Sequence, residues 1–135
     1  MKKIIAGLMI AAAMLTFGCG GRNADFGTVD MERIQSEAPV VKQTQEDFTK
    51  KMTELKTEMD KELEGKTGDE AKKVSDDYAA KAKLVQSEAM NKLKSSQDAA
   101  LKQVADEKKL GAILDKRAVP QGGTDVTSDV IAKMK

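Results

Sequence analysis

Cys19 carries the most specific chemistry in this 135-residue sequence, because it is the only cysteine. It follows a short positive start at residues 1–3 and an apolar run at residues 4–15, and it stands among the small residues 18–21. This order is typical of a secretory signal peptide, to which we assign residues 1–19. The apolar run is shorter than the ~20 residues that a membrane-spanning helix needs. We therefore expect export, and not a membrane anchor made of protein.

Two interpretations of Cys19 stay open. It is either an incidental cysteine, discarded or left free at a terminus, or the acylated first residue of a lipoprotein. Gly18 fits the lipoprotein cleavage pattern, whereas Thr16 and Phe17 depart from it, because leucine and then a small residue are usual there. An acylated Cys19 would tether the chain to a membrane.

Residue types that support catalysis are scarce. The sequence has no histidine, which removes the commonest general base and the commonest metal ligand together. The neighbouring carboxylates Asp76 and Asp77 lie in a charged stretch without a base or a metal-binding partner. The glycine pairs at residues 20–21 and 122–123 lack the following lysine of a phosphate-binding loop. We predict a binding protein that is not an enzyme and that uses no cofactor or metal.

Charge and aromatic content narrow the class further. The formal net charge is +1, and loss of Lys2 and Lys3 with the signal peptide would lower it to about −1. A nearly neutral chain does not favour a nucleic-acid-binding surface. After the signal peptide the aromatic residues are Phe26, Phe48 and Tyr78, too few for a thick globular core. The composition favours an elongated helical protein.

Residues 38–109 are predicted to form an antiparallel helical hairpin with its tip near residues 65–70, because Gly65 and Gly68 interrupt the helical pattern. Apolar and small residues recur in steps of 3, 4 and 4 on both sides of this break. An eleven-residue repeat averages about 3.67 residues per turn, which favours a nearly straight pair of helices. We predict that the two rows form the seam between the helices. The rows are Val41, Thr44, Phe48, Met52, Leu55, Met59 and Leu63, and then Ala71, Val74, Tyr78, Ala82, Val85, Ala89, Leu93, Ser96, Ala100 and Val104.

Residues 20–37 and 110–135 are predicted to form a strand-containing base where the hairpin ends meet. We expect strands at residues 26–30, a buried strand at 112–114 and a third strand starting at 118–119, which Pro120 confines to an edge. A final helix at residues 128–134 would be capped by Thr127. Three short strands are marginal alone and leave open edges. We therefore predict a mainly helical α+β fold that oligomerises through its base.

The motifs at the two ends of the chain, taken with the long hairpin between them, carry a family resemblance. They are residues 27–34 (GTVDMERI), 113–116 (ILDK), 118–119 (AV), 122–127 (GGTDVT) and 129–131 (DVI). In this order around a charged hairpin, they resemble the Skp/OmpH family of periplasmic chaperones. The resemblance covers essentially the whole chain after the signal peptide.

The resemblance implies a homotrimer in which the bases form a shared β-structured body and the hairpins surround a central cavity. It implies a periplasmic holdase that binds unfolded outer-membrane proteins after export and prevents their aggregation without ATP. The near-neutral charge departs from the better-known members, which are strongly basic. A lipid on Cys19 would also be unusual in the family.

Side chains of the arms that the seam does not use are predicted to contact unfolded clients, with Phe48 and Tyr78 as partly exposed aromatic residues. Another group of apolar residues is predicted to serve assembly at the base. For every residue of the client-contact set and of the assembly set, the competing interpretation is ordinary packing within the chain. The client-contact set is Val40, Phe48, Tyr78, Leu84, Met90 and Leu101. The set predicted to serve assembly at the base is Val29, Met31, Ile34, Ile113, Leu114 and Val119.

Two other functions fit part of the sequence. A structural envelope lipoprotein could use the helical rod as a spacer, although such a spacer has no need of residues 112–135. A coiled-coil adaptor would instead bind one defined partner.

Overall fold

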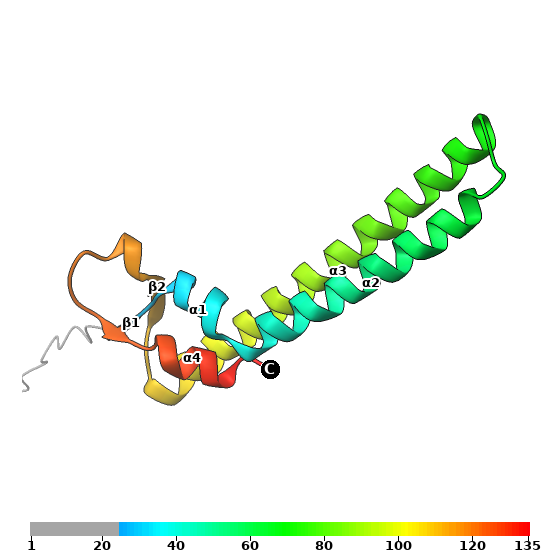
Figure 1. Cartoon of the computed structure of the whole chain (residues 1–135). Helices are drawn as coiled ribbons and strands as arrows, with labels where there is room; N and C mark the ends of the chain where they lie inside the picture. Colours follow the sequence, from blue (N-terminus) through cyan, green and yellow to red (C-terminus); the bar gives the residue numbers. More distant parts are fainter. Residues whose placement is uncertain (1–24) are drawn as a thin grey trace, which may run out of the picture.

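The computed structural model describes residues 25–135, so the predicted signal peptide and Cys19 lie outside the described residues. Two long helices lie side by side and project from a base made of short strands and helices (Figure 1). The chain is therefore mainly helical, with a small parallel sheet. In chain order the elements are β1 (Phe26–Val29), α1 (Met31–Glu37), α2 (Pro39–Leu63), α3 (Asp69–Lys108), β2 (Ala112–Asp115), η1 (Lys116–Ala118), β3 (Thr124–Asp125) and α4 (Thr127–Lys133).

The arm consists of α2, α3 and the turn between them. With 25 and 40 residues, the two helices are ~38 and ~60 Å long. The turn lies at the predicted break, and its residues Gly65 and Gly68 have positive φ angles of 77° and 63°. Glycine adopts such angles without the steric cost that a Cβ imposes. The predicted interruption of the helix is confirmed.

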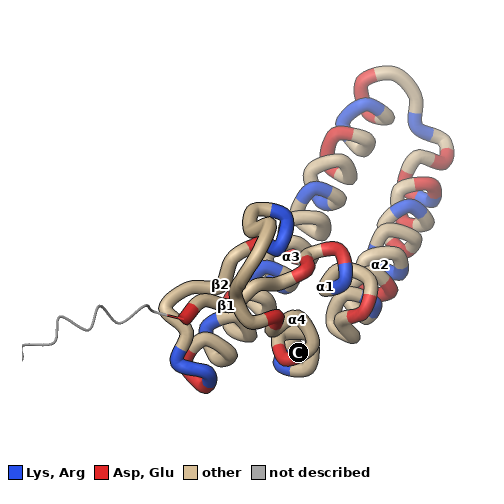
Figure 2. Tube along the Cα trace, turned by 90° about the vertical axis from the view of Figure 1, so that its left-hand side faces the viewer, with Lys and Arg blue, Asp and Glu red and all other residues tan. Residues whose placement is uncertain are grey.

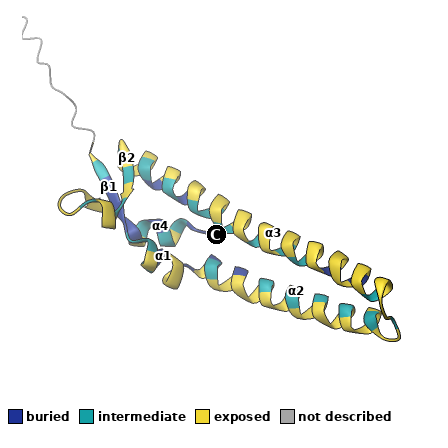
Figure 3. Cartoon of the chain, turned by 90° about the horizontal axis from the view of Figure 1, so that it is seen from above, coloured by how far each residue is buried: buried dark blue, intermediate teal, exposed yellow. Residues whose placement is uncertain are grey.

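The predicted rows face the interior of the helix pair. Every residue of both rows is buried or half-buried. Between residues 45 and 95 the only other side chain that is not exposed is Lys66. Most of the remaining ribbon of both arm helices is coloured as exposed (Figure 3). The eleven-residue repeat therefore identified the inner faces of α2 and α3 correctly.

The sheet has β1 at its centre, in the order β2-β1-β3. β1 runs parallel to both neighbours, with Thr28 opposite Leu114 in β2 and Asp125 in β3. The prediction that the first strand pairs with the C-terminal strands is confirmed. β2 is an edge strand, however, and Leu114 is 42% exposed, so the prediction of a buried strand is wrong.

The prediction of a strand beginning at residues 118–119 is also wrong. Residues 116–118 form the 3₁₀ turn η1, in which the Arg117 amide donates to Asp115 Oδ1 at 2.9 Å. This side-chain bond offers the backbone an alternative to a strand ladder. The third strand lies instead at Thr124–Asp125.

The core lies in the base, where α1, α4 and the lower end of α3 meet. Ile34, Val104 and Val130 are each no more than 1% exposed. Thr127 is the first residue of α4, and Val126 takes the cap position, so the predicted capping role of Thr127 is wrong. The Thr127 hydroxyl is fully buried, donates to Asp125 Oδ1 at 2.6 Å and accepts from the Asp30 amide at 3.0 Å. It thereby joins α4 to β3 and to the end of β1.

Candidate binding surfaces

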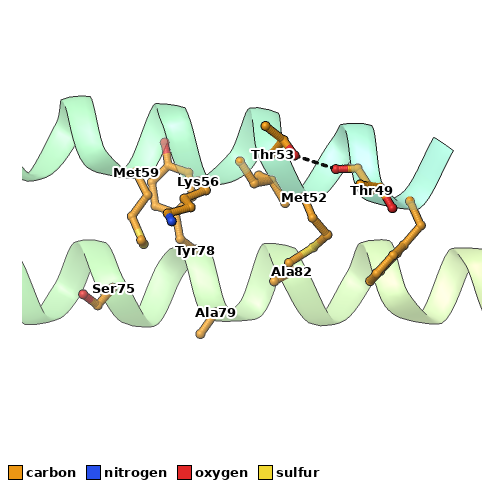
Figure 4. A pocket seen from close by; sticks show the side chains of 11 residues that line it. Thr49, Met52, Thr53, Lys56, Met59, Ser75, Tyr78, Ala79 and Ala82 are labelled. Carbon is orange, nitrogen blue, oxygen red and sulfur yellow. Dashed lines mark hydrogen bonds between the residues drawn. The ribbon is translucent and has the colours of Figure 1, made fainter. Parts of the chain in front are cut away.

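The outer half of the arm contains an apolar groove of about 760 Å³ between α2 and α3, which we call the outer groove. Met52 and Met59 reach from α2 toward α3, where Ala82 and Tyr78 lie (Figure 4). Lys56 is the one charged residue in its lining. The full lining is Phe48, Thr49, Met52, Thr53, Leu55, Lys56, Met59, Ser75, Tyr78, Ala79 and Ala82.

The groove follows from a mismatch between the two rows of seam residues. In this part of the arm α2 contributes large residues such as Phe48, Met52 and Leu55. The lining residues of α3 are small, such as Ala82, apart from the ring of Tyr78. Well-packed interiors leave few voids larger than a water molecule, so a space of this size is unusual in a seam. The flexible thioethers of Met52 and Met59 can adapt to different occupants. Both rows were visible in the sequence, so the difference in side-chain size between them was a signal that could have revealed the groove.

A smaller gap of about 170 Å³ lies nearer the base. Two ion pairs between the helices border it, Lys51 with Glu88 at 3.2 Å and Lys92 with Asp47 at 3.5 Å. All four side chains are about half exposed, and such pairs contribute little to stability. Thr44 also lines this gap, and its buried hydroxyl has no hydrogen-bond partner.

Lys or Arg positions and Asp or Glu positions are interspersed along both helices of the arm (Figure 2), and nearly all of these residues are exposed. Within this charged surface two large apolar side chains of α3 stand out, Leu84 at 65% exposed and Met90 at 63%. The prediction that these two side chains are free of the seam is confirmed. Whether they contact clients stays a prediction.

Other residues of the predicted client-contact set lie elsewhere. Tyr78 is 7% exposed and sits in the seam with Lys81 Nζ 4.2 Å from its ring centroid, so the prediction of a partly exposed ring is wrong. Val40 is 2% exposed, because α2 begins against the base and packs there. Leu101 is half-buried against the same core. Phe48 is half-buried and lines the outer groove.

The pKa of Tyr78 is raised by desolvation and by the nearby carboxylates of Glu62 and Glu58. A phenol is already protonated at neutral pH at its ordinary pKa of ~10, and the raised pKa keeps Tyr78 uncharged further into the alkaline range. It presents a hydroxyl and an apolar ring to the groove, without a negative charge.

Two residues predicted to serve assembly are enclosed within one chain. Val29 is 3% exposed and Ile34 is 1% exposed, which corrects their assignment to contacts between copies. Leu114 is exposed on the edge strand β2, whereas the remaining three are half-buried. Those three are Met31, Ile113 and Val119. A role in assembly stays a prediction for these four residues.

Residues 25–135 contain neither a metal-binding cluster nor a membrane-spanning helix. This region has no group of three or more His, Cys, Asp or Glu side chains placed to hold a metal ion. None of the helices in the described region combines the length and apolar character needed to cross a bilayer. In comparisons with known proteins, no family profile matches the chain and no curated protein matches it.

Proposed function

We propose that this chain is a periplasmic holdase chaperone of the Skp/OmpH kind, which binds unfolded outer-membrane proteins after export and needs no ATP. The observation that carries the proposal is the arm, which is long, charged outside and open to apolar ligands. The outer groove gives access to the seam, and Leu84 and Met90 add apolar contacts on the surface of α3. These features suit binding of exposed apolar segments, whereas a rod that only spaces two layers does not need them.

The arm is proposed to act as an antiparallel hairpin. Its two ion pairs between helices support this direction, because Asp47 pairs with Lys92 and Lys51 pairs with Glu88. A rise of four residues along α2 thus corresponds to a fall of four along α3. The tip then lies farthest from the base, where an unfolded chain could reach both the groove and the exposed residues.

The base is proposed to join copies of the chain into a homotrimer. Within residues 25–135, β2 and β3 each have a neighbour on one side only, and Leu114 on β2 is 42% exposed. Pairing these edges between copies would remove open edges of the kind that proteins usually protect. The number three comes from the family resemblance.

A holdase of this type works by mass action. Several weak apolar contacts on different arms add up to strong binding, while each contact exchanges quickly. The signal segment before residue 20 would direct the chain to the periplasm. A lipid on Cys19 would add a membrane tether.

The test is light scattering of a porin diluted from urea, with and without the full mature chain, combined with its mass in solution. We expect suppressed aggregation and a trimeric mass. The double variant Leu84→Ser/Met90→Ser should suppress aggregation less well. Ala80→Ser/Ala99→Ser is the matched control, because both alanines are exposed on the same helix.

A monomer without effect on porin aggregation would overturn the proposal. Activity toward one porin and none toward unrelated porins would favour an adaptor. A trimer that leaves aggregation of all tested porins unchanged would favour a structural envelope protein.

A further inference from the structure

We propose that the outer groove binds one extended polypeptide segment whose apolar side chains alternate along its sequence. This inference rests on the proposed function and names the kind of client segment that a single arm recognises. Both walls of the groove come from one chain, so the site needs no second copy.

A row of hydrogen-bond acceptors lies along α2. The hydroxyls of Thr49, Thr53 and Thr57 donate to the carbonyls of Gln45, Thr49 and Thr53 at 2.9, 2.8 and 2.9 Å. Each hydroxyl proton is therefore in use, and the oxygen lone pairs remain as acceptors. All three threonines are exposed, and Thr49 and Thr53 line the groove.

The spacing of this row matches an extended chain. Four residues of α-helix advance ~6.0 Å, and two residues of a β-strand advance ~6.7 Å. A strand lying along α2 can therefore place the amides of alternate residues opposite Thr49 and Thr53. A helical ligand uses its amides internally and would leave these acceptors unpaired.

The size of the groove also suits an extended segment. From Phe48 to Met59 it extends along α2 for ~17 Å, the length of about five strand residues. Alternate side chains of a strand point to the same face, so about three apolar side chains would enter the groove. Ala82, which lies opposite Met52, is small and leaves room for them (Figure 4). The volume of the groove, about 760 Å³, lies within the ~300–1,000 Å³ of typical ligand sites.

The positive charge of Lys56 favours an acidic residue in the bound segment. Lys56 lines the groove beside the threonine row and takes part in none of the ion pairs found within residues 25–135. An aspartate or glutamate at one end of the bound segment would pair with its ammonium group. The preferred segment thus has alternating apolar residues and one terminal acidic residue.

The binding test uses the full mature chain and fluorescence anisotropy of two labelled peptides. One alternates valine and threonine and ends in aspartate, and the other has the same composition with the valines consecutive. Within five residues the second peptide can place one valine fewer in the groove. We expect it to bind about tenfold more weakly.

Matched variants locate the site. Thr53→Val keeps the shape but removes an acceptor, and we expect a loss of alternating-peptide affinity of about three- to tenfold. Thr67→Val removes an exposed hydroxyl in the turn after α2, beyond the groove, and should leave affinity unchanged. Ala82→Leu fills the groove and should weaken binding at least ~tenfold, without lowering the melting temperature.

Equal binding of the two peptides would overturn the inference. Unchanged affinity in both Ala82→Leu and Thr53→Val would do the same. If Ala82→Leu loses helical circular dichroism, the comparison of Thr53→Val with Thr67→Val decides alone. A wild-type chain that protects porins but does not bind the alternating peptide refutes this inference and leaves the proposed function standing. Failure in both assays refutes both.

Discussion

The base and the arm bury their apolar side chains to different degrees. In the base, Ile34, Val104 and Val130 are almost completely enclosed by several elements. In the outer arm most seam residues are only half-buried, because each helix has a single partner. The base can therefore supply most of the stability, while the arm keeps apolar surface within reach of a ligand.

The two regions also differ in how they treat buried hydroxyls. In the base, the Thr127 hydroxyl bonds to both Asp125 and the Asp30 amide. In the arm, the buried hydroxyls of Thr44 and Ser96 have no partner. The base thus has a fully bonded polar network, whereas the seam of the arm contains unsatisfied polar atoms at some cost in stability.

The largest expected effect is a loss of stability in the base that exceeds the loss from a similar truncation in the arm. We expect Ile34→Ala to lower the free energy of unfolding by ~2–5 kcal/mol, because it opens a cavity in the enclosed core. Leu55→Ala in the half-buried seam should cost only ~1 kcal/mol. Urea unfolding followed by circular dichroism measures both variants. Equal losses would mean that base and arm contribute alike, contrary to the comparison.

Two glycines with similar backbone angles provide the next test. Gly123 has a φ of +80°, and an added Cβ would lie 2.6 Å from a carbon of the Phe26 ring. Gly65 at the tip has a φ of +77° with nothing within 4 Å of such a Cβ. Both alanine variants carry a left-handed strain of ~1–2 kcal/mol.

Gly123→Ala should cost ~1–3 kcal/mol more than Gly65→Ala, because it also forces atoms together in the base. Thermal melting of the two variants side by side measures the difference. If both melt at the same temperature, the Phe26 ring moves aside freely, and the base is less tightly packed at that point than we infer.

A smaller effect is expected from the buried network of the base. Thr127→Val keeps the shape of the side chain but leaves the part-buried Asp30 amide without its acceptor. We expect a loss of ~1–3 kcal/mol in the free energy of unfolding. Thr127→Ser restores the hydroxyl and should recover part of that loss. If Thr127→Ser is no better than Thr127→Val, packing of the methyl group matters more than the hydrogen bonds.

The arm could be predicted from sequence because one repeating pattern determines it. Each helix has one partner, so the same spacing fixes both the helices and their inner faces. Val40 shows where that reasoning ends. It lies outside the predicted row and is nevertheless buried, because the base covers a second side of α2 there.

The details of the base could not be predicted in the same way. β3 is a two-residue strand at Thr124–Asp125, formed only because Gly27 and Thr28 of β1 lie beside it. Short strands depend on tertiary neighbours more than on local propensity. The outer groove was missed because its volume depends on how closely the helices approach, although the small Ala82 facing large residues of α2 was visible in the sequence.

Removing a buried hydroxyl should raise the free energy of unfolding in the arm, whereas it lowers the free energy of unfolding in the base. Thr44 is 3% exposed, and its oxygen has no hydrogen-bond partner. Thr44→Val replaces this unsatisfied group with a methyl group of similar size, and we expect a gain of ~0.5–1 kcal/mol in the free energy of unfolding. Urea unfolding of Thr44→Val and Thr127→Val, each compared with the wild type, measures the two changes in the free energy of unfolding. A loss in Thr44→Val would mean that its hydroxyl is satisfied in solution.

The smallest effect is expected from the ion pairs that hold α4 to α3 in the base. Glu107 Oε1 accepts from Lys133 Nζ at 2.8 Å and from Gln103 Nε2 at 2.9 Å. These two hydrogen bonds, the one from Lys133 first, lower the pKa of Glu107. A carboxylate with a lowered pKa stabilises the fold above the ordinary glutamate value of ~4.3, and that contribution is lost as the pH falls through the lower folded-state value.

We therefore expect the melting temperature of the wild-type chain to fall between about pH 5 and pH 3. Glu107→Gln and Lys133→Gln should each make that fall shallower, because each removes the linked pair. The difference should be small, since the side chains of Glu107 and Lys133 are 49% and 33% exposed and solvent screens them. Hydrogen exchange measures the protection of the α4 amides. This protection should fall more steeply with decreasing pH in the wild type than in Glu107→Gln. Identical pH profiles in all three proteins would mean that this pair does not contribute to holding the base together.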